Sequence, residues 1–204
     1  MRPKLVYYVA CTVDAFIARE NGSLDWALSQ GDHFRDLIVN FPETFPAHLR
    51  SKLGIPADAR RFDTVLMGRR TYEVGLREGI TSPYTPLRQF VVTRSLRESP
   101  DPAITLHPGP PLDLVRGLKA QSGKDIWLCG GSDLAGAVFS EIDELILKIN
   151  PVLIGAGIPL FRGVSGTFPA VLIEHHIYPN GFVFARYERD SAVAFPNLAS
   201  VFSA

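Results

Sequence analysis

The sequence lacks an excess of charge of either sign. Its 21 lysine and arginine residues balance 21 aspartate and glutamate residues, so the formal net charge is zero. Proteins that bind nucleic acid usually carry a basic excess, so this balance argues against a nucleic-acid partner. A phosphate-bearing ligand must therefore meet a local cluster of arginines.

Cysteine is scarce as well. The two cysteines, Cys11 and Cys129, each stand at the end of an apolar run. Free thiols in a reducing compartment explain this pattern better than a disulfide or a metal pair. The five histidines are scattered. His175 and His176 are adjacent on an expected strand and so face opposite sides. We predict no metal site.

Long apolar runs and the common nucleotide motifs are also missing. No run is long enough to span a bilayer, and the first residues lack the apolar stretch of a signal peptide. We therefore expect a cytoplasmic protein with no membrane partner. The sequence contains neither G-x-G-x-x-G nor G-x-x-x-x-G-K-[ST], which excludes the Rossmann fingerprint and the Walker loop.

Short apolar segments alternate with helical patterns along the 204 residues. The expected strands are 5–11, 64–67, 89–93, 104–106, 126–129, 144–153, 171–178 and 182–188. The expected helices are 32–41, 43–53, 70–76, 112–121 and 132–141, and residues 12–25 are expected to form a long loop. This order predicts an α/β fold of three layers. It consists of a mostly parallel central sheet, helices on both faces and an antiparallel C-terminal hairpin. We expect a single domain over residues 1–204.

The segment Leu66–Glu73 joins a strand to a helix and contains the first candidate site. The N–H groups at a helix start are unpaired and the helix dipole favours negative charge there. Gly68 lets a ligand approach the main chain, Arg69 and Arg70 supply charge, and Thr71 adds a hydroxyl. The alternative is an ordinary turn with solvated arginines.

A second strand ends in Thr93, Arg94 and Ser95. In a parallel sheet, ligands bind outside the carboxyl ends of the strands, so we expect this segment to lie near Gly68. Two hydroxyls and an arginine suit a phosphate monoester. A solvated arginine at a strand end is the alternative.

A third strand runs through Cys129 into Gly130 and Gly131, where bare backbone can pack against a pyrophosphate or a ribose. Ser132 is expected to cap the helix that follows, and a tight turn is again the alternative. Asp133 is unfavourable beside a phosphate unless its carboxylate points away.

In this order, these segments resemble the dihydrofolate reductase superfamily. They are most similar to its branch near the reductase domain of riboflavin biosynthesis, the RibD C-terminal type. The matching segments are 9–18, 21–26, 66–73, 91–95, 129–134, 143–145, 151–155 and 157–161. The resemblance covers most of the chain up to Phe161, and the terminal hairpin also fits. The set is specific in combination, although each segment is weak alone.

The resemblance implies NADPH as the hydride donor. The implied cofactor-binding residues are Ala10, Ile17, Gly68, Arg69, Arg70, Thr71, Thr93, Arg94, Ser95, Cys129, Gly130, Gly131, Ser132 and Leu134. Residues 69–71 match the helix start that holds the adenosine phosphates. Residues 93–95 match the strand end that receives the 2′-phosphate. Ala10 and Ile17 correspond to residues that contact the nicotinamide.

On the substrate side, the candidates are Asp14, Asp25 and Trp26, together with residues 41–62, a segment longer than expected and rich in proline. The implied proton donor is Asp32, which a one-residue shift of the alignment brings into place. The alternatives for Asp32 are a helix cap or a solvated acid, with an ordered water as the donor. Ala15 follows Asp14 where the branch usually has glycine, which is expected to stiffen the loop.

The sequence therefore predicts an NADPH-dependent oxidoreductase. It would transfer hydride to a C=N or C=O bond of a small substrate resembling a pterin or a pyrimidine. The rival hypothesis is a non-catalytic NADP(H)-binding sensor or scaffold. The resemblance also implies a homodimer, with residues 182–185 and 195–202 as a candidate interface, although 195–202 would equally cap the core of the same chain.

Overall fold

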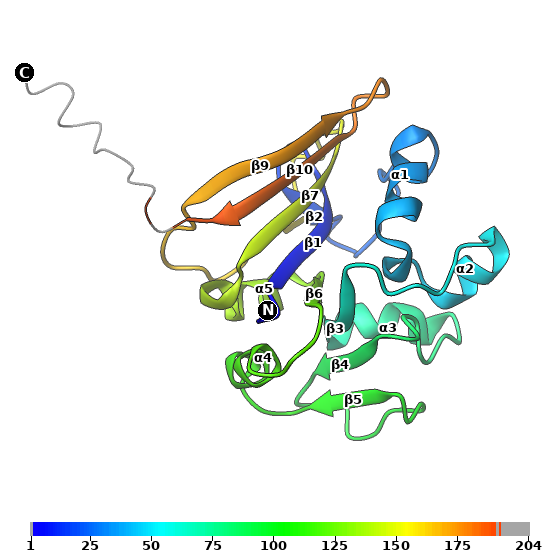
Figure 1. Cartoon of the computed structure of the whole chain (residues 1–204), viewed down its shortest axis with the longest axis vertical. Coiled ribbons are helices and arrows are strands. Elements are labelled where there is room, and N and C mark those ends of the chain that lie inside the picture. Colours follow the sequence, from blue (N-terminus) through cyan, green and yellow to red (C-terminus); the bar gives the residue numbers. More distant parts are fainter. Residues whose placement is uncertain (1, 191, 193–204) are drawn as a thin grey trace, which may run out of the picture.

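The computed structural model describes residues 2–190 and residue 192 of the chain (Figure 1). The strands are β1 (Leu5–Thr12), β2 (Phe16–Ala18), β3 (Phe62–Gly68), β4 (Arg88–Val92), β5 (Ile104–His107), β6 (Asp125–Cys129), β7 (Glu144–Asn150), β8 (Ile158–Pro159), β9 (Ala170–Ile177) and β10 (Val183–Arg189). The helices are α1 (Asp32–Asn40), α2 (Ala47–Leu53), α3 (Arg69–Arg77), α4 (Pro111–Lys119) and α5 (Ser132–Ala137), with short 3-10 turns η1 (Pro42–Thr44) and η2 (Phe139–Glu141).

Eight of the strands form one sheet in the order β5-β4-β3-β6-β1-β7-β10-β9. The pairings from β5 to β7 are parallel, and β10 runs antiparallel to both β7 and β9. The central strands are buried on both faces, which explains their nearly continuous apolar sequences. The predicted mostly parallel sheet with an antiparallel terminal hairpin is confirmed.

The two faces of the sheet carry separate apolar cores because successive side chains of a strand point to opposite sides. Val6 and Tyr8 of β1 pack with Leu37 of α1 and Tyr72 of α3 in one core. Leu5 and Tyr7 lie in the other core, which contains Val115 and Leu118 of α4 and Leu134 and Ala135 of α5. The predicted layers of helices on both faces are therefore present, and Figure 1 shows α4 and α1 on opposite sides of the sheet.

Three details of the sequence prediction were wrong. Residues 43–53 do not form one helix, because Phe45 and Pro46 adopt extended backbone between the turn η1 and helix α2. The expected loop 12–25 contains β2, which pairs with β8 in a separate two-stranded sheet. The cap of α5 is Gly131 rather than Ser132, and no side chain caps this helix.

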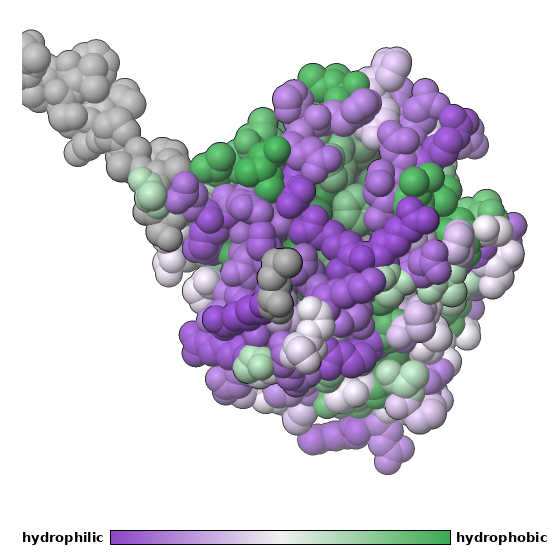
Figure 2. All heavy atoms as spheres, viewed as in Figure 1, coloured by the Kyte–Doolittle hydropathy of each residue, from purple (hydrophilic) through white to green (hydrophobic). Residues whose placement is uncertain are grey.

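The terminal hairpin leaves β9 at the edge of the sheet. Tyr178 N–H donates to the carbonyl of Phe182 at 2.9 Å, and Gly181 has φ 83°, so the turn requires a residue that tolerates this conformation. Val171, Leu172 and Ile173 of β9 are all exposed, and Figure 2 shows apolar surface along this strand. The predicted interface residues 182–185 do not form a free edge, because β10 is paired with β7 and β9 and Phe182, Phe184 and Ala185 are buried. Residues 195–202 of the predicted interface lie outside the described residues.

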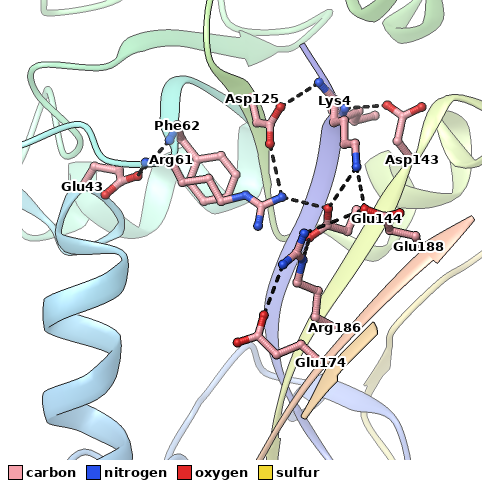
Figure 3. Close-up of polar contacts among 11 residues, drawn as sticks. Lys4, Glu43, Arg61, Phe62, Asp125, Asp143, Glu144, Glu174, Arg186 and Glu188 are labelled. Carbon is pink, nitrogen blue, oxygen red and sulfur yellow. Dashed lines mark hydrogen bonds and ion pairs between the residues drawn. The ribbon is translucent and has the colours of Figure 1, made fainter. Parts of the chain in front are cut away.

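A network of charged residues joins the strands at the end of the sheet opposite the predicted cofactor site (Figure 3). Glu144, whose side chain is fully buried, accepts from Arg186 Nε at 2.7 Å and from Arg61 Nη2 at 2.8 Å, and Lys4 Nζ lies 3.8 Å away. A buried carboxylate is tolerated when several cations and hydrogen bonds surround it. This network ties β1, β3, β7 and β10 together, far along the strands from Gly68.

Among the residues that the structure describes, no helix is both long and apolar enough to cross a membrane.

Candidate functional site

The carboxyl ends of β4, β3 and β6 lie side by side. Met67 pairs with Val91 on one side and with Cys129 on the other, and Gly68 pairs with Val92. The three segments that follow these strands, at residues 69, 93 and 130, therefore start from one edge of the sheet. The sequence prediction that they lie together is confirmed in this respect.

Two helices begin at this edge and neither has a capping side chain. Gly68 precedes α3, and Gly131 precedes α5 with φ 84°. Gly130 also has positive φ, 63°, so two successive residues adopt a conformation that favours glycine. Since the first N–H groups of a helix have no partner within it, both helix starts offer donors to an anion.

The two glycine turns contact each other through Thr71 and Leu134. A Cβ atom placed on Gly131 would lie 3.6 Å from Thr71 Oγ1, and one placed on Gly68 would lie 3.9 Å from Leu134 Cβ. Ser132 Oγ is buried and has no hydrogen-bond partner among the described residues. A buried hydroxyl without a partner is costly, and a ligand phosphate or ribose at this turn would satisfy it. These residues therefore fit the dinucleotide that the resemblance implies.

The arginines beside the glycine turns differ in how far they are already paired. Arg69 contacts Glu73 at 2.6 Å, and Arg70 lies 3.6 Å from Asp133. Asp133 also lies 3.5 Å from Arg162. Two arginines therefore offset the negative charge of Asp133, which would otherwise repel a phosphate at this turn. Arg94 is exposed and has no ion pair with any residue of the described chain. Of these three arginines of the predicted site, Arg94 is the one without an ion pair among the described residues.

Thr93 shapes the turn after β4. Its side chain is buried, and Thr93 Oγ1 accepts hydrogen bonds from the N–H groups of Ser95 at 3.3 Å and Leu96 at 3.0 Å. This short-range pattern is typical of hydroxyl side chains in turns. Arg94 and Ser95 remain exposed on the turn that Thr93 holds.

The loop between β1 and β2 is braced by Asp14. Thr12 Oγ1 donates to Asp14 Oδ1 at 2.6 Å, and the N–H groups of Ile154 and Gly155 donate to Asp14 Oδ2 at 3.0 and 2.8 Å. These hydrogen bonds, that from Thr12 first, lower the pKa of the Asp14 carboxyl because they favour its ionised form. Both carboxylate oxygens are engaged within the protein, so Asp14 positions this loop.

The nicotinamide candidates lie on either side of this loop. Ala10 of β1 is half-buried and Ile17 of β2 is buried. Gly157 passes close to β2, and a Cβ atom on it would lie 2.4 Å from the carbonyl oxygen of Ala18. Only glycine allows this approach, which holds Ile17 in place through the β2–β8 pairing.

The structure separates the substrate-side candidates. Trp26 is buried, and its indole N–H has no partner among the described residues, whereas Asp25 is exposed and pairs with Arg19 at 2.6 Å. Asp32 lies at the start of α1 with a side chain 70% exposed and pairs with Arg35 at 3.3 Å. It forms no hydrogen bond or ion pair with the cofactor candidates, all of which lie among the described residues.

Sequence reasoning missed Lys148 of β7, which lies beside Ala10 in the sheet. Its ammonium lies 3.9 Å from the centroid of the Tyr8 ring, and burial lowers its pKa to about 8. The sequence feature that could have identified Lys148 is its position as the single lysine in the nearly apolar run 144–153.

Two hollows in the surface lie away from these strand ends. One of about 410 Å³ is bounded by α1, the terminal hairpin and Arg61, and one of about 250 Å³ by α2 and Pro86. Neither is lined by a residue proposed for the cofactor, but both are lined in part by the substrate-side segment 41–62, through Phe41 and Arg61 in the first and Ala47 and Ile55 in the second. Within the described chain, no group of three histidine, cysteine or acidic residues is arranged to hold a metal ion.

Comparison with known proteins places this arrangement in a family. Residues 3–181 match the sequence model of the RibD C-terminal domain. The uncharacterized protein YwjB of Bacillus subtilis (strain 168) is 32% identical over 167 residues, which are 81% of this chain and 86% of YwjB. The uncharacterized protein YyaP of the same strain is 25% identical over 193 residues, which are 88% of this chain and 92% of YyaP.

Solved structures share the fold. A putative riboflavin biosynthesis protein from Shewanella sp. PV-4 aligns with a TM-score of 0.66 at 22% identity, over 92% of this chain and 99% of that one. A diaminohydroxyphosphoribosylaminopyrimidine deaminase/5-amino-6-(5-phosphoribosylamino)uracil reductase from Thermotoga maritima aligns at 0.62 and 15% identity, over 93% of this chain and 57% of that one. A pyrimidine reductase-like protein from Corynebacterium diphtheriae NCTC aligns at 0.59 and 16% identity, over 92% of both chains.

Proposed function

The chain belongs to the RibD C-terminal domain family, and on this premise we propose that it is an NADPH-dependent reductase. Its substrate would be a small heterocycle, resembling a pyrimidine or a pterin, that accepts hydride at a C=N or C=O bond. The observation that carries the proposal is the meeting of three strand ends with two uncapped helix starts at one edge of the sheet.

In this proposal, each cofactor candidate has a role that its surroundings support. The starts of α3 and α5 would hold the adenosine phosphates and the pyrophosphate, with Ser132 Oγ as a further hydrogen-bond partner. Arg94 and Ser95 would receive the 2′-phosphate that distinguishes NADPH from NADH. Ala10 and Ile17 would contact the nicotinamide, in a loop that Asp14 braces.

NADPH would supply the hydride, and the protein would supply placement and electrostatics. Trp26 would close the substrate side together with residues 41–62, which excludes water from the reacting atoms. Ala10 is half-buried and Trp26 is buried, which fits a shielded site of this kind.

A non-catalytic NADP(H)-binding protein is the second candidate, and one observation favours it. Asp32, the implied proton donor, is largely exposed and paired with Arg35. A protein that kept the cofactor site and lost a proton donor would bind the dinucleotide without turnover.

A reductase assay separates the two candidates. The purified protein would be mixed with NADPH and a panel that contains a dihydropterin, a quinone and 5-amino-6-(5-phosphoribosylamino)uracil. Oxidation of NADPH that depends on one of these compounds supports the reductase. Saturable binding of NADPH without turnover of any of them supports the sensor or scaffold.

For the assembly, we propose a homodimer in which a second copy covers the apolar edge strand β9. Val171, Leu172, Ile173 and Ile177 are exposed there, and unpaired edge strands with apolar side chains tend to associate. Sedimentation at micromolar concentration tests this, and substitution of Leu172 with lysine is expected to yield monomers.

A further inference from the structure

Lys148 is an ionisable side chain in an unexpected place. In the register of the sheet it pairs with Ala10 of β1 on one side and with Phe184 of β10 on the other. Its side chain lies on the same face as Tyr8, because the ammonium lies 3.9 Å from the centroid of that ring. Tyr8 and Ala10 are two residues apart on β1 and so share this face. Lys148 therefore lies next to Ala10, the residue expected to contact the nicotinamide, on the same face of the sheet.

The surroundings of the ammonium contain no anion that would neutralise it. The titratable groups near it are Tyr8 and Cys11 of β1 and Cys129 of β6, whose thiol in turn lies 3.7 Å from the hydroxyl of Tyr84 in the loop before β4. Burial raises the pKa of each of these four groups, so all are neutral at pH 7. Within residues 2–190, no carboxylate pairs with Lys148.

Most charged groups of the covering elements are engaged elsewhere. On α1, Asp32 pairs with Arg35 and Asp36 accepts from the hydroxyl of Tyr178 at 2.9 Å. On the hairpin, Arg186 pairs with Glu144 and Glu174, and the ring of His176 packs against Tyr178. In the 3-10 turn η1, Glu43 Oε1 accepts from the N–H groups of Arg61 and Phe62, whereas Glu43 Oε2 is buried without a hydrogen-bond partner among the described residues. None of these carboxylates forms an ion pair with Lys148, whose only charge partners within the described chain are the thiols of Cys11 and Cys129.

We propose that Lys148 donates the proton to the substrate, the role that the sequence had assigned to Asp32. The inference rests on the proposed reductase function. NADPH supplies a hydride with its electron pair to the carbon of a C=N bond. The nitrogen of that bond takes a proton from Lys148 Nζ, whose N–H bond breaks. The neutral amine of Lys148 then recovers a proton from water.

The pKa of Lys148 suits this role. Burial lowers it to about 8, so the group is mostly protonated at pH 7 and yet is a far better acid than an ordinary lysine. Proton donors work best when their pKa lies near the working pH. Above pH 8 the amine loses its proton, and the rate of reduction is expected to fall.

The first test measures the ionisation of Lys148 directly. The sequence contains five lysines, so reductive methylation with ¹³C-formaldehyde yields a simple NMR spectrum, and Lys148→Met assigns one signal. We expect the Lys148 signal to titrate near pH 8, whereas an ordinary lysine titrates near about 10.4. A Lys148 signal that titrates at the ordinary value overturns the proposal, whichever substrate the protein reduces.

The second test separates proton donation from packing. Lys148→Arg keeps a cation over the Tyr8 ring but does not release a proton near neutral pH. Lys148→Met keeps the length and removes the charge. We expect both variants to lower kcat by about 10²- to 10⁴-fold and to lose the fall in rate above pH 8, with NADPH affinity within about twofold of wild type. Thermal melting confirms that each variant is folded.

The outcomes distinguish this proposal from the one on which it rests. Wild-type kcat in either variant, with NADPH bound normally, overturns the role of Lys148 and leaves the reductase function standing. Rescue of activity by arginine shows a structural cation and also overturns the role. Failure of the wild-type protein to bind NADPH contradicts the proposed function itself. Binding of NADPH without turnover of any panel compound contradicts the reductase function and, with it, the role of Lys148.

Discussion

Asp14 and Gly155 are joined by a hydrogen bond of 2.8 Å, in which the backbone N–H of Gly155 donates to the Asp14 carboxylate. The bond links the loop after β1 to the segment after β7, two parts of the chain 141 residues apart in sequence. Together with the contact from Ile154, it holds the turn that leads to Ile17. The nicotinamide end of the proposed site therefore depends on one carboxylate.

Replacement of Asp14 with asparagine is expected to loosen this turn and to lower the melting temperature. The native pKa of Asp14 is lowered, so its carboxylate stabilises the fold at pH values above the ordinary aspartate pKa of about 3.9. This stabilisation is lost as the pH falls through the native pKa. Melting curves of both proteins from pH 7 to pH 3 should converge at the acidic end. A difference that is constant over this range would contradict the role given to the ionised carboxylate.

Ala15 carries backbone strain next to Asp14. Its φ is 62°, the left-handed region that costs an L-residue about 1–2 kcal/mol. Ala15→Gly should raise the free energy of unfolding by about 1 kcal/mol, as measured by urea denaturation. Ala120→Gly is the matched control, since Ala120 has φ −81° and glycine relieves nothing there. Equal effects of the two substitutions would show that Ala15 is not strained.

Glu144 is expected to be critical for folding. Glu144→Gln removes the fully buried carboxylate that Arg61 and Arg186 share, and the free energy of unfolding should fall by about 3 kcal/mol. Glu174→Gln removes a carboxylate that is 55% exposed, and its cost should stay below about 1 kcal/mol. Chemical denaturation of both variants checks the contrast. Similar small costs would mean that solvent already screens the Glu144 network.

Arg94 should decide between the two nicotinamide cofactors. Arg94→Ala removes a charge-assisted hydrogen bond to the 2′-phosphate, a contribution of about 1.5–3 kcal/mol, so the Kd for NADPH should rise about 10- to 100-fold. The Kd for NADH, which lacks this phosphate, should hardly change. Arg97→Ala, at another exposed arginine of the same segment, serves as the control. Equal losses of affinity for NADPH and NADH would show that Arg94 does not bind the 2′-phosphate.

The sequence was informative about the sheet because its physical signals are local. Apolar runs that end in glycine or hydroxyl residues predicted the strand ends at Gly68, Thr93 and Gly130, and the parallel order brings them to one edge. Between the expected strands 171–178 and 182–188, Pro179-Asn180-Gly181 is a turn sequence that indicates a hairpin. The short pairing of β2 with β8 left no such signal, since the two strands have only three and two residues.

The orientation of individual side chains could not be predicted from the sequence. The start of α1 was predicted correctly, but the face on which Asp32 lies depends on how α1 packs, and the packing buries His33 and Leu37 instead. The position of Lys148 in the site could not be predicted for a similar reason. Its register partner Ala10 and its contact with Tyr8 arise from the pairing of β1 with β7, which joins segments far apart in the chain.

The most direct measurement is a titration of the purified protein with NADPH and, separately, with NADH, followed by nicotinamide fluorescence. We expect a micromolar Kd for NADPH and binding of NADH at least about tenfold weaker, because only NADPH carries the 2′-phosphate that Arg94 is proposed to bind. Absence of binding by either dinucleotide would contradict the cofactor site, and with it the proposed reductase.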